Sequence, residues 1–252
     1  MKIIYSPRFA HAEYAKDNAA LPGRMEAAMS GLRAGGWEIL EPTEASIAQL
    51  LAAHDPAYVE GVRRDGQLFA MAGLAAGGAI LAARIALAGE AAFACIRPPG
   101  HHASRDGGWG YCTFNNMAVA LMALRGEGAV ASPYVIDIDQ HTGDGTRSLL
   151  AAWPGAAVFN PFADKAWNYT RLVEESLSGI DRADIIGVSA GFDAYRLDVG
   201  KKLETVDFER IGGLVKAASL RLCGGRRFAI LEGGYYLEDL GANVLAFCRG
   251  LA

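Results

Sequence analysis

The sequence predicts an α/β protein built on an open, parallel β-sheet with helices on both faces. Short runs of β-branched and apolar residues alternate with longer amphipathic segments along the whole chain. The runs are apolar at nearly every position, which is typical of parallel strands covered on both sides. No low-complexity linker or internal repeat interrupts the 252 residues, so we expect one domain over residues 1–252.

Each expected strand is a short apolar run, and each expected helix fills a gap between two such runs. The strands cover Lys2–Tyr5, Ala92–Ile96, Tyr134–Ile138, Ala157–Asn160, Ile185–Ser189 and Phe228–Leu231. The helices cover Gly23–Ala34, Glu44–Ala53, Ala57–Arg64, Leu74–Ala88, Asn115–Leu124, Tyr169–Leu177, Val206–Leu222 and Leu237–Cys248. Because the strands are unevenly spaced along the chain, an open sheet is favoured over a closed barrel.

The composition argues against several classes of protein. The chain has 24 basic and 28 acidic residues, a formal charge of −4, which gives no indication of nucleic-acid binding. With 52% hydrophobic and 21% charged residues it has enough apolar surface to fold, so disorder is not expected. The four cysteines form no C-x-x-C pair, which argues against a disulfide framework and against a thiolate zinc site.

Two apolar segments bear on location. Met71–Gly89 is interrupted by Arg84 and is rich in alanine and glycine, so it is interpreted as a buried helix and no membrane contact is expected. Met1–Tyr5 runs into Ser6-Pro7 without a long apolar stretch, so we expect no secretory signal and a cytoplasmic protein.

Polar motifs follow four of the expected strands. In open α/β sheets ligands bind beyond the carboxyl ends of the strands, so these motifs are where chemistry is expected. They are R-P-P-G-H-H-A (97–103), D-I-D-Q-H-T-G-D-G-T (137–146), S-A-G-F-D-A (189–194) and E-G-G-Y-Y (232–236). The chain has 31 glycines, and several lie in these motifs, where the backbone must turn sharply close to a ligand.

The second motif has the spacing of a metal site. Asp137, Asp139 and His141 lie two residues apart, so at a strand end their side chains point to one side. Asp193, at the end of another strand, is a possible further ligand. Oxygen and nitrogen ligands of this kind suit Zn²⁺, with Fe²⁺ as a rival. A solvated loop edge with a histidine in a turn is the alternative interpretation.

The first and last motifs suggest proton transfer and oxyanion stabilisation. His101 and His102 are adjacent, and a carboxylate such as Asp137 or Asp144 would fix a histidine tautomer for acid–base catalysis. Tyr235 follows two glycines, which would aim its phenol at the mouth of the sheet. The alternatives are surface histidines in a loop and an aromatic side chain that only packs. The same applies to Tyr111, which either lines a pocket or packs.

Together the motifs resemble the zinc-dependent deacetylases, the family of histone deacetylases, acetoin-utilisation proteins and acetylpolyamine amidohydrolases. The resemblance begins faintly at H-D-P-A-Y-V (54–59) and covers most of the chain. Its specific motifs, in the family's order, are R-P-P-G-H-H-A (97–103), G-Y-C-T-F-N-N (110–116), D-I-D-Q-H-T-G-D-G-T (137–146), S-A-G-F-D-A (189–194) and E-G-G-Y (232–235). The resemblance implies an arginase/deacetylase-like fold and hydrolysis of an acetylated amine, a small molecule or a peptide.

The resemblance also implies a role for each site residue. A catalytic Zn²⁺ would be held by Asp139, His141 and Asp193, with room left for water and the substrate carbonyl. His102, oriented by Asp144, would be the general base and acid, while His101 paired with Asp137 would give electrostatic support. Tyr235 would donate to the tetrahedral intermediate, and Gly110 and Tyr111 would form a wall of the substrate tunnel. A structural K⁺ would lie near Asp137, with main-chain carbonyls at Asp139 and His141.

The chain departs from the family pattern in places. Thr142 stands where many relatives have a second histidine, at a position that is not assigned to the metal. The stretches Val62–Gly73 and Asn160–Tyr169 are short where relatives carry rim loops, and Asn160 falls near a position that contributes to the K⁺ site. We therefore expect a shallow tunnel, and the sequence leaves the acetylated substrate and the oligomeric state open.

Two other functions are considered. Dimanganese ureohydrolases share this kind of fold, but they need a D-x-H-x-D order with further aspartates, whereas this chain has D-x-D-x-H and one late aspartate. A member of the family that binds an acetylated ligand without turnover is the other alternative, suggested by the shortened loops. Every residue expected to be catalytic is present, which favours an enzyme.

Overall fold

The computed structural model describes residues 1–252 and places seven parallel strands in one open sheet. Their order across the sheet is β2-β1-β3-β7-β6-β4-β5. The strands are β1 (Lys2–Ile4), β2 (Glu38–Leu40), β3 (Ala92–Ala94), β4 (Pro133–Asp137), β5 (Ala157–Phe159), β6 (Ile185–Ala190) and β7 (Arg227–Leu231). The predicted fold class is confirmed.

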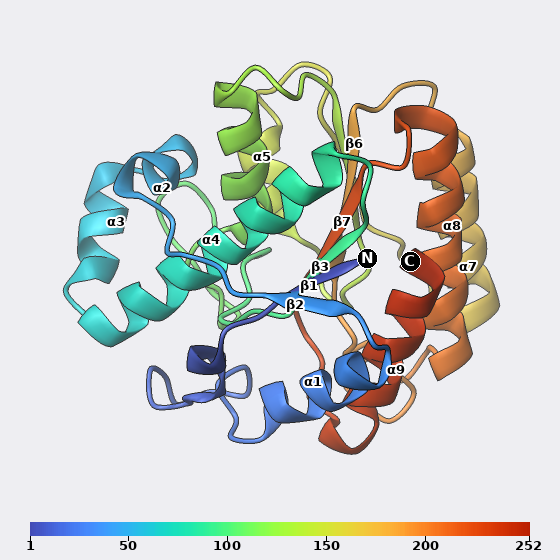
Figure 1. Ribbon diagram of the computed structural model, residues 1–252, viewed down its shortest axis with the longest axis horizontal. Coiled ribbons are helices and arrows are strands. Elements are labelled where there is room, and N and C mark those ends of the chain that lie inside the picture. The colour runs from blue at the N-terminus through green and yellow to red at the C-terminus, as the bar shows by residue number, and fades with distance from the viewer.

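Helices cover both faces of this sheet (Figure 1). One group consists of α2 (Ile47–Ala53), α3 (Pro56–Arg63), α4 (Gly66–Leu87) and α5 (Asn116–Gly126). The other consists of α1 (Arg24–Ala34), α7 (Ala166–Ser178), α8 (Thr205–Cys223) and α9 (Leu237–Leu251), where α9 packs on both α1 and α8. The remaining elements are the 3₁₀ helix η1 (Pro7–Ala10) and α6 (Asp144–Leu150), the short helix that follows β4.

The long apolar helix α4 lies in the core. It is long and apolar enough to cross a membrane by those two criteria alone, yet 61% of its most apolar stretch is buried inside the protein. It packs against β1, β3, β7 and α5. Gly77 lets the helix approach the chain before α2 closely, because a Cβ there would lie 1.8 Å from the Thr43 carbonyl oxygen. The interpretation of this segment as a buried helix agrees with the structure.

The structure differs from the sequence prediction mainly in short or polar elements. Strand β2 was not expected, because it has only three residues, lies at the sheet edge and exposes both Glu38 and Ile39. Helix α4 begins at Gly66 rather than Leu74, and the side chain of Asp65 caps it. The stretch Val62–Gly73 therefore holds the end of α3 and the first turns of α4.

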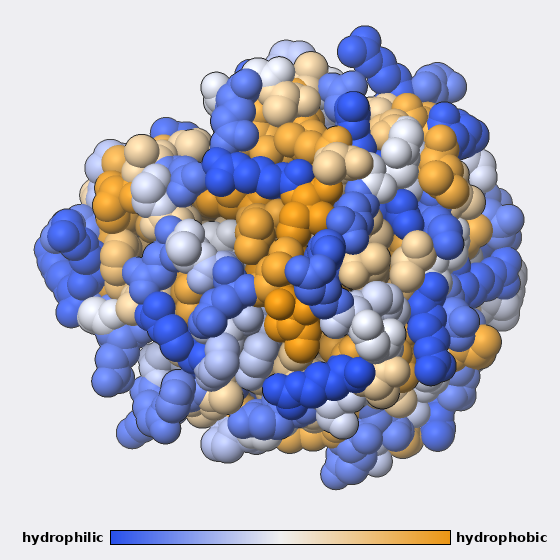
Figure 2. Space-filling view, viewed as in Figure 1, coloured by the Kyte–Doolittle hydropathy of each residue, from blue (hydrophilic) through white to orange (hydrophobic).

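Apolar residues reach the surface on the face seen in Figure 2, near the middle of the view, where α4 and the edge strand β2 lie in Figure 1. Polar side chains surround this band. Inside, 71 buried hydrophobic residues form one continuous core that includes side chains from both faces of the sheet. All four cysteines are buried and unpaired.

Candidate active site

The four polar motifs meet because their strands are neighbours. Strands β3, β7, β6 and β4 are adjacent in the sheet, and each is followed directly by one of the motifs. Since all strands are parallel, the four carboxyl ends lie at the same edge. Residues that are more than 130 positions apart along the chain thereby come into hydrogen-bond contact, as Gly100 and Glu232 do.

A cluster of three side chains has the character of a metal site. The candidate ligand atoms of Asp139, His141 and Asp193 all lie within 4.8 Å of one another. The Nδ1 atom of His141 is 3.0 Å from Asp139 Oδ1 and 3.0 Å from Asp193 Oδ2. Both aspartates are buried, and Asp193 Oδ2 has no hydrogen-bond partner of good geometry. A buried carboxylate oxygen without a donor is unfavourable unless a cation binds there, so these residues fit a divalent metal.

The backbone around this cluster orients the two carboxylates. The Gly233 N–H donates to Asp139 Oδ2 at 2.9 Å, and the Gln140 N–H donates to Asp193 Oδ1 at 2.9 Å. Glycine is required at Gly191 as well, since a Cβ there would lie 2.2 Å from Asp139 Oδ2. Asp139 Oδ1 also accepts from the His141 N–H at 2.9 Å. Backbone donors thus orient both carboxylates, and each has one oxygen turned to the His141 ring.

The charges of the cluster also favour a cation. Burial and the neighbouring Asp139 raise the pKa of Asp193 to about 7. The neighbouring carboxyl groups of Asp139 and Asp193 raise the pKa of His141 to about 10. These shifts show that acidic oxygens converge on the imidazole nitrogen, as they do where a cation is bound.

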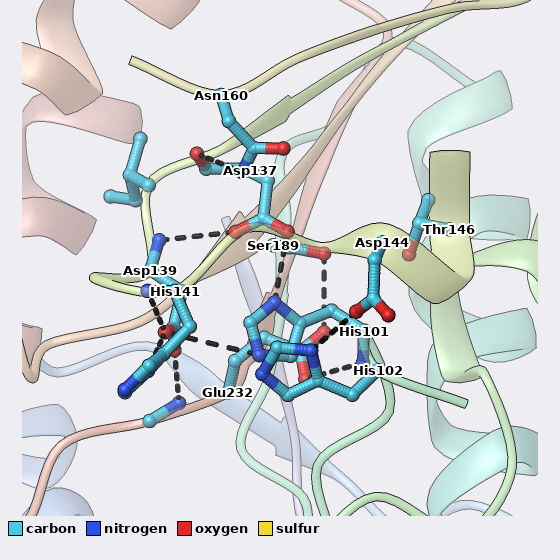
Figure 3. Close-up of polar contacts among 12 residues, drawn as sticks. His101, His102, Asp137, Asp139, His141, Asp144, Thr146, Asn160, Ser189 and Glu232 are labelled. Carbon is cyan, nitrogen blue, oxygen red and sulfur yellow. Dashed lines mark hydrogen bonds and ion pairs between the residues drawn. The ribbon is translucent and has the colours of Figure 1, made fainter. Parts of the chain in front are cut away.

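Beside the metal cluster lies a fully buried histidine–aspartate pair. His101 Nδ1 donates to Asp137 Oδ2 at 3.0 Å, and the side chains are 4% and 0% exposed (Figure 3). The other oxygen of Asp137 accepts from the Asp139 N–H at 3.1 Å. His101 Nε2 lies 3.8 Å from Asp139 Oδ1, so this pair is in contact with the metal cluster.

A second histidine–aspartate pair lies nearer the surface. His102 Nδ1 donates to Asp144 Oδ1 at 2.6 Å, and the side chain of Asp144 is 52% exposed (Figure 3). Burial, together with the positive charge of His101, lowers the pKa of His102 below its usual value. The imidazole is therefore neutral at neutral pH, and with its N–H directed to Asp144, Nε2 is free to accept a proton.

A cavity of about 300 Å³ gives access to these groups. The lining residues are Asn18, Pro99, His101, His102, Trp109, Gly110, Tyr111, His141, Val199, Gly233 and Tyr235. Gly110 and Tyr111 both have positive φ angles, 57° and 68°, which bend this wall toward His102. The Tyr111 ring lies edge-on to the Tyr235 ring, with 6.0 Å between centroids.

Tyr235 is held in a form that can donate. Burial raises its pKa well above the usual value of a phenol, so the hydroxyl stays protonated. The guanidinium of Arg24 lies 5.4 Å from the centre of its ring. The N–H groups of Tyr235 and Tyr236 both donate to Asp198 Oδ2, at 2.6 and 2.7 Å, which fixes the loop after β7. Six of the ten residues predicted for the site line this cavity. The other four, Asp137, Asp139, Asp144 and Asp193, do not line it but contact its histidines.

Three residues of the site received no role from the sequence. Glu232 is buried and its Oε2 accepts from the Gly100 N–H at 2.7 Å, so it anchors the histidine loop to β7, while burial raises its pKa to about 7. Arg24 donates to the Gly234 carbonyl at 2.8 Å. Trp109 donates to Asp144. Of these three, only Glu232 could have been recognised from the sequence, because it is a carboxylate directly after a buried strand.

Comparisons with known proteins identify the relatives of this chain. A family model described as "Histone deacetylase domain" matches residues 19–179. A probable deacetylase of Methanothermobacter thermautotrophicus is 30% identical over 100% of this chain and 90% of its own length. An acetylpolyamine amidohydrolase of Burkholderia pseudomallei is 30% identical over 64% of this chain and 56% of its own length. The human polyamine deacetylase HDAC10 is 29% identical over 88% of this chain and 43% of its own length.

Solved structures share the fold. A crystal structure of an acetylpolyamine aminohydrolase from Burkholderia pseudomallei superposes with a TM-score of 0.86 at 24% identity, covering 100% of this chain and 98% of that chain. The HDA15 HD domain gives a TM-score of 0.85 at 22% identity, covering 99% and 88%. The family model covers more than half of the chain, and the Methanothermobacter relative matches it from end to end. The chain therefore belongs to the histone deacetylase family and is a hydrolase of amide bonds.

Proposed function

We propose that this protein is a metal-dependent deacetylase that releases acetate from an acetylated amine. The observation that carries the proposal is the Asp139–His141–Asp193 cluster beside a cavity lined by His102 and Tyr235. A metal ligand set, a neutral imidazole and a protonated phenol around one cavity are the groups that amide hydrolysis needs. Relatives named as deacetylases and as an acetylpolyamine amidohydrolase support it.

Asp139, His141 and Asp193 would hold the metal. Two carboxylates and one imidazole suit Zn²⁺, and Fe²⁺ is the rival ion for the same donors. When bound, the ion supplies Lewis acidity to the acetyl carbonyl and acidifies water.

His102 carries the proton through the reaction. Its free Nε2 takes a proton from the attacking water, and the imidazolium that results is stabilised by Asp144 at Nδ1. His102 then delivers the proton to the nitrogen of the departing amine. Tyr235 donates its hydroxyl to the oxyanion of the tetrahedral intermediate. Acetate and a free amine leave.

The His101–Asp137 pair would support this chemistry without exchanging the substrate's proton. It is buried, and it contacts both the second pair and the metal cluster: the two histidine rings are 4.0 Å apart, and His101 Nε2 lies 3.8 Å from Asp139 Oδ1. A charge fixed there acts on His102 through a medium of low dielectric, where electrostatic effects are strong. We assign His101 and Asp137 to electrostatic support.

A structural K⁺ near Asp137 is part of the proposal. Asn160 Nδ2 donates to the Asp137 carbonyl at 3.1 Å, and Asn160 Oδ1 is buried without a partner (Figure 3). With the main-chain carbonyls at Asp139 and His141, such oxygens fit K⁺. We expect K⁺ to raise the melting temperature relative to choline at equal ionic strength. Equal melting temperatures would contradict this site.

The substrate would be a slender acetylated amine, a small molecule or a peptide side chain. The walls at Gly110, Tyr111 and Tyr235 limit the width of the cavity. The alignment to the Methanothermobacter relative runs over 306 positions against the 252 residues of this chain, which supports shortened rim loops and a shallow tunnel. The named activities of the polyamine deacetylase and the acetylpolyamine amidohydrolase make acetylpolyamines the first class to test.

The test is acetate release from a panel of acetylpolyamines, acetyl-lysine peptides and small acetylated amines by the metal-loaded protein. We expect turnover of at least one class, and Tyr235→Phe should lose turnover while it keeps its metal. Absence of acetate release across the panel, with an active positive control, would contradict the proposal. Ligand binding that is unchanged in Tyr235→Phe, without turnover in the native protein, would indicate a binding protein instead.

A further inference from the structure

Trp109 makes two contacts with the outer histidine–aspartate pair. Its ring lies over the His102 ring, with 3.8 Å between centroids and 31° between planes. Its indole N–H donates to Asp144 Oδ2 at 3.1 Å, while Asp144 Oδ1 accepts from His102 at 2.6 Å. Trp109, Asp144 and His102 therefore form a closed set in which each group contacts the other two.

The backbone is built to place the indole there. Trp109 lies between Gly108 and Gly110, and neither position has space for a side chain. A Cβ on Gly110 would lie 2.6 Å from His102 Cδ2, and one on Gly108 would lie 2.3 Å from the Cys112 carbonyl oxygen. Gly110 also has a φ of 57°, which disfavours other residues. These glycines let the loop run directly against His102, with the indole over its face.

Hydrophobic burial does not explain why the Trp109 side chain lies over His102. Trp109 is 57% exposed, so more than half of its surface still faces water. Large apolar side chains gain stability mainly from the area that they remove from water. The polar contact to Asp144 and the stacking on His102 are the specific features of the site, and both involve the proposed proton-transfer pair.

Asp144 needs such a partner because it lies near the surface. Its side chain is 52% exposed at the start of α6, so nothing buried around it fixes its second oxygen. Partial burial would raise the pKa of Asp144, but the hydrogen bonds from His102 and Trp109 outweigh it and lower the pKa. The bond from Trp109 also limits rotation of the carboxylate that aligns His102.

We propose that Trp109 is a positioning residue for the deacetylation, acting on His102 through Asp144. The inference rests on the proposed function. It concerns a residue that lines the cavity and contacts both members of this pair. The indole N–H orients the carboxylate, the carboxylate orients the imidazole, and the indole ring shields one face of the imidazole from water.

Trp109→Phe removes the donor and keeps an aromatic ring. We expect kcat to fall by roughly three- to tenfold, the effect of losing the net contribution of one ordinary hydrogen bond, with KM changed by less than about twofold. Trp167→Phe is the matched control, because Trp167 is 69% exposed on α7 and does not line the cavity. It should leave kcat unchanged.

A double-mutant cycle separates positioning from a general effect on the loop. In the Asp144→Ala background, Trp109→Phe should change kcat by less than about twofold, because the acceptor of the indole N–H is gone and phenylalanine keeps a ring over His102. An equal loss in both backgrounds would overturn the inference, and so would a change confined to KM, which would make Trp109 a substrate contact.

A spectroscopic readout does not depend on turnover. The downfield proton resonance of His102 Nδ1–H, assigned by its loss in Asp144→Ala, should shift or broaden in Trp109→Phe and stay in place in Trp167→Phe. An unchanged resonance would overturn the inference. A native protein that releases no acetate contradicts the proposed function, whereas an active native protein with an equally active Trp109→Phe contradicts only the role of Trp109.

Discussion

The two adjacent histidines are bound to aspartates in the same way but in different surroundings. Both donate from Nδ1 to a carboxylate, His101 to the fully buried Asp137 and His102 to the half-exposed Asp144. Although burial opposes it, the carboxylates of Asp137 and Asp139 raise the pKa of His101 well above the usual value. Burial and His101 lower the pKa of His102. One local pattern therefore raises the pKa of the inner histidine and lowers that of the outer histidine, which makes the outer imidazole the better proton acceptor at neutral pH.

The largest expected effect is a loss of activity that is much greater for His102→Ala than for His101→Ala. His102→Ala should lower kcat by about 10²- to 10⁴-fold, because it removes the group that moves the proton. His101→Ala should cause a smaller loss, because that side chain acts only through the field at the site. Both are measured as acetate release from variants with equal metal content. A greater loss in His101→Ala would reverse the assignment of the two pairs.

For stability the inner pair should matter more: the free energy of unfolding should fall further in Asp137→Ala than in Asp144→Ala. Asp137→Ala leaves the buried His101 without its partner and should lower the free energy of unfolding by about 3–5 kcal/mol. Asp144→Ala breaks a pair at the surface and should lower it by less than about 1 kcal/mol. Urea unfolding of both variants checks this under identical metal loading. Equal losses would show that the difference in burial has no energetic consequence.

The smallest expected effect is a displacement of the pH profile. The acid limb of kcat/KM reports the protonation of His102 in the free enzyme, since only the neutral imidazole accepts a proton. Asp144 raises the pKa of His102 against the lowering by burial and His101. Asp144→Asn removes that opposing effect, so the acid limb should move to lower pH. A move to higher pH would show that another group controls this limb.

The sequence predicted the parts of the fold and site that leave local patterns. Strands such as β4 and β6 are buried at every position, so their apolar runs are continuous. Strand β2 has only three residues, two of them exposed, and helix α6 has only seven and opens with Asp144-Gly145. Neither leaves a clear pattern in the sequence. The candidate site residues were recognisable because they directly follow strands or lie in compact motifs. The ligand set and the pairing of each histidine with its aspartate came from the family resemblance.

Residues that act on the site through other residues were not predictable in this way. Arg24 lies at the start of α1 and reaches the loop after β7, more than 200 positions away in sequence. The contact of Trp109 with Asp144 depends on two loops that only the folded sheet brings together. Neither contact follows a spacing rule. The contact of Trp109 depends on the order of β3, β7, β6 and β4 in the sheet, and that of Arg24 on the packing of α1 against α9.

The most direct test of the account is a zinc titration of chelator-stripped protein with acetate release followed in the same samples. The account predicts that activity rises linearly to one Zn²⁺ per chain, and that Asp193→Ala neither retains the ion at that stoichiometry nor regains activity. Full acetate release by the stripped protein, or an active form that holds two Mn²⁺ per chain, would contradict it.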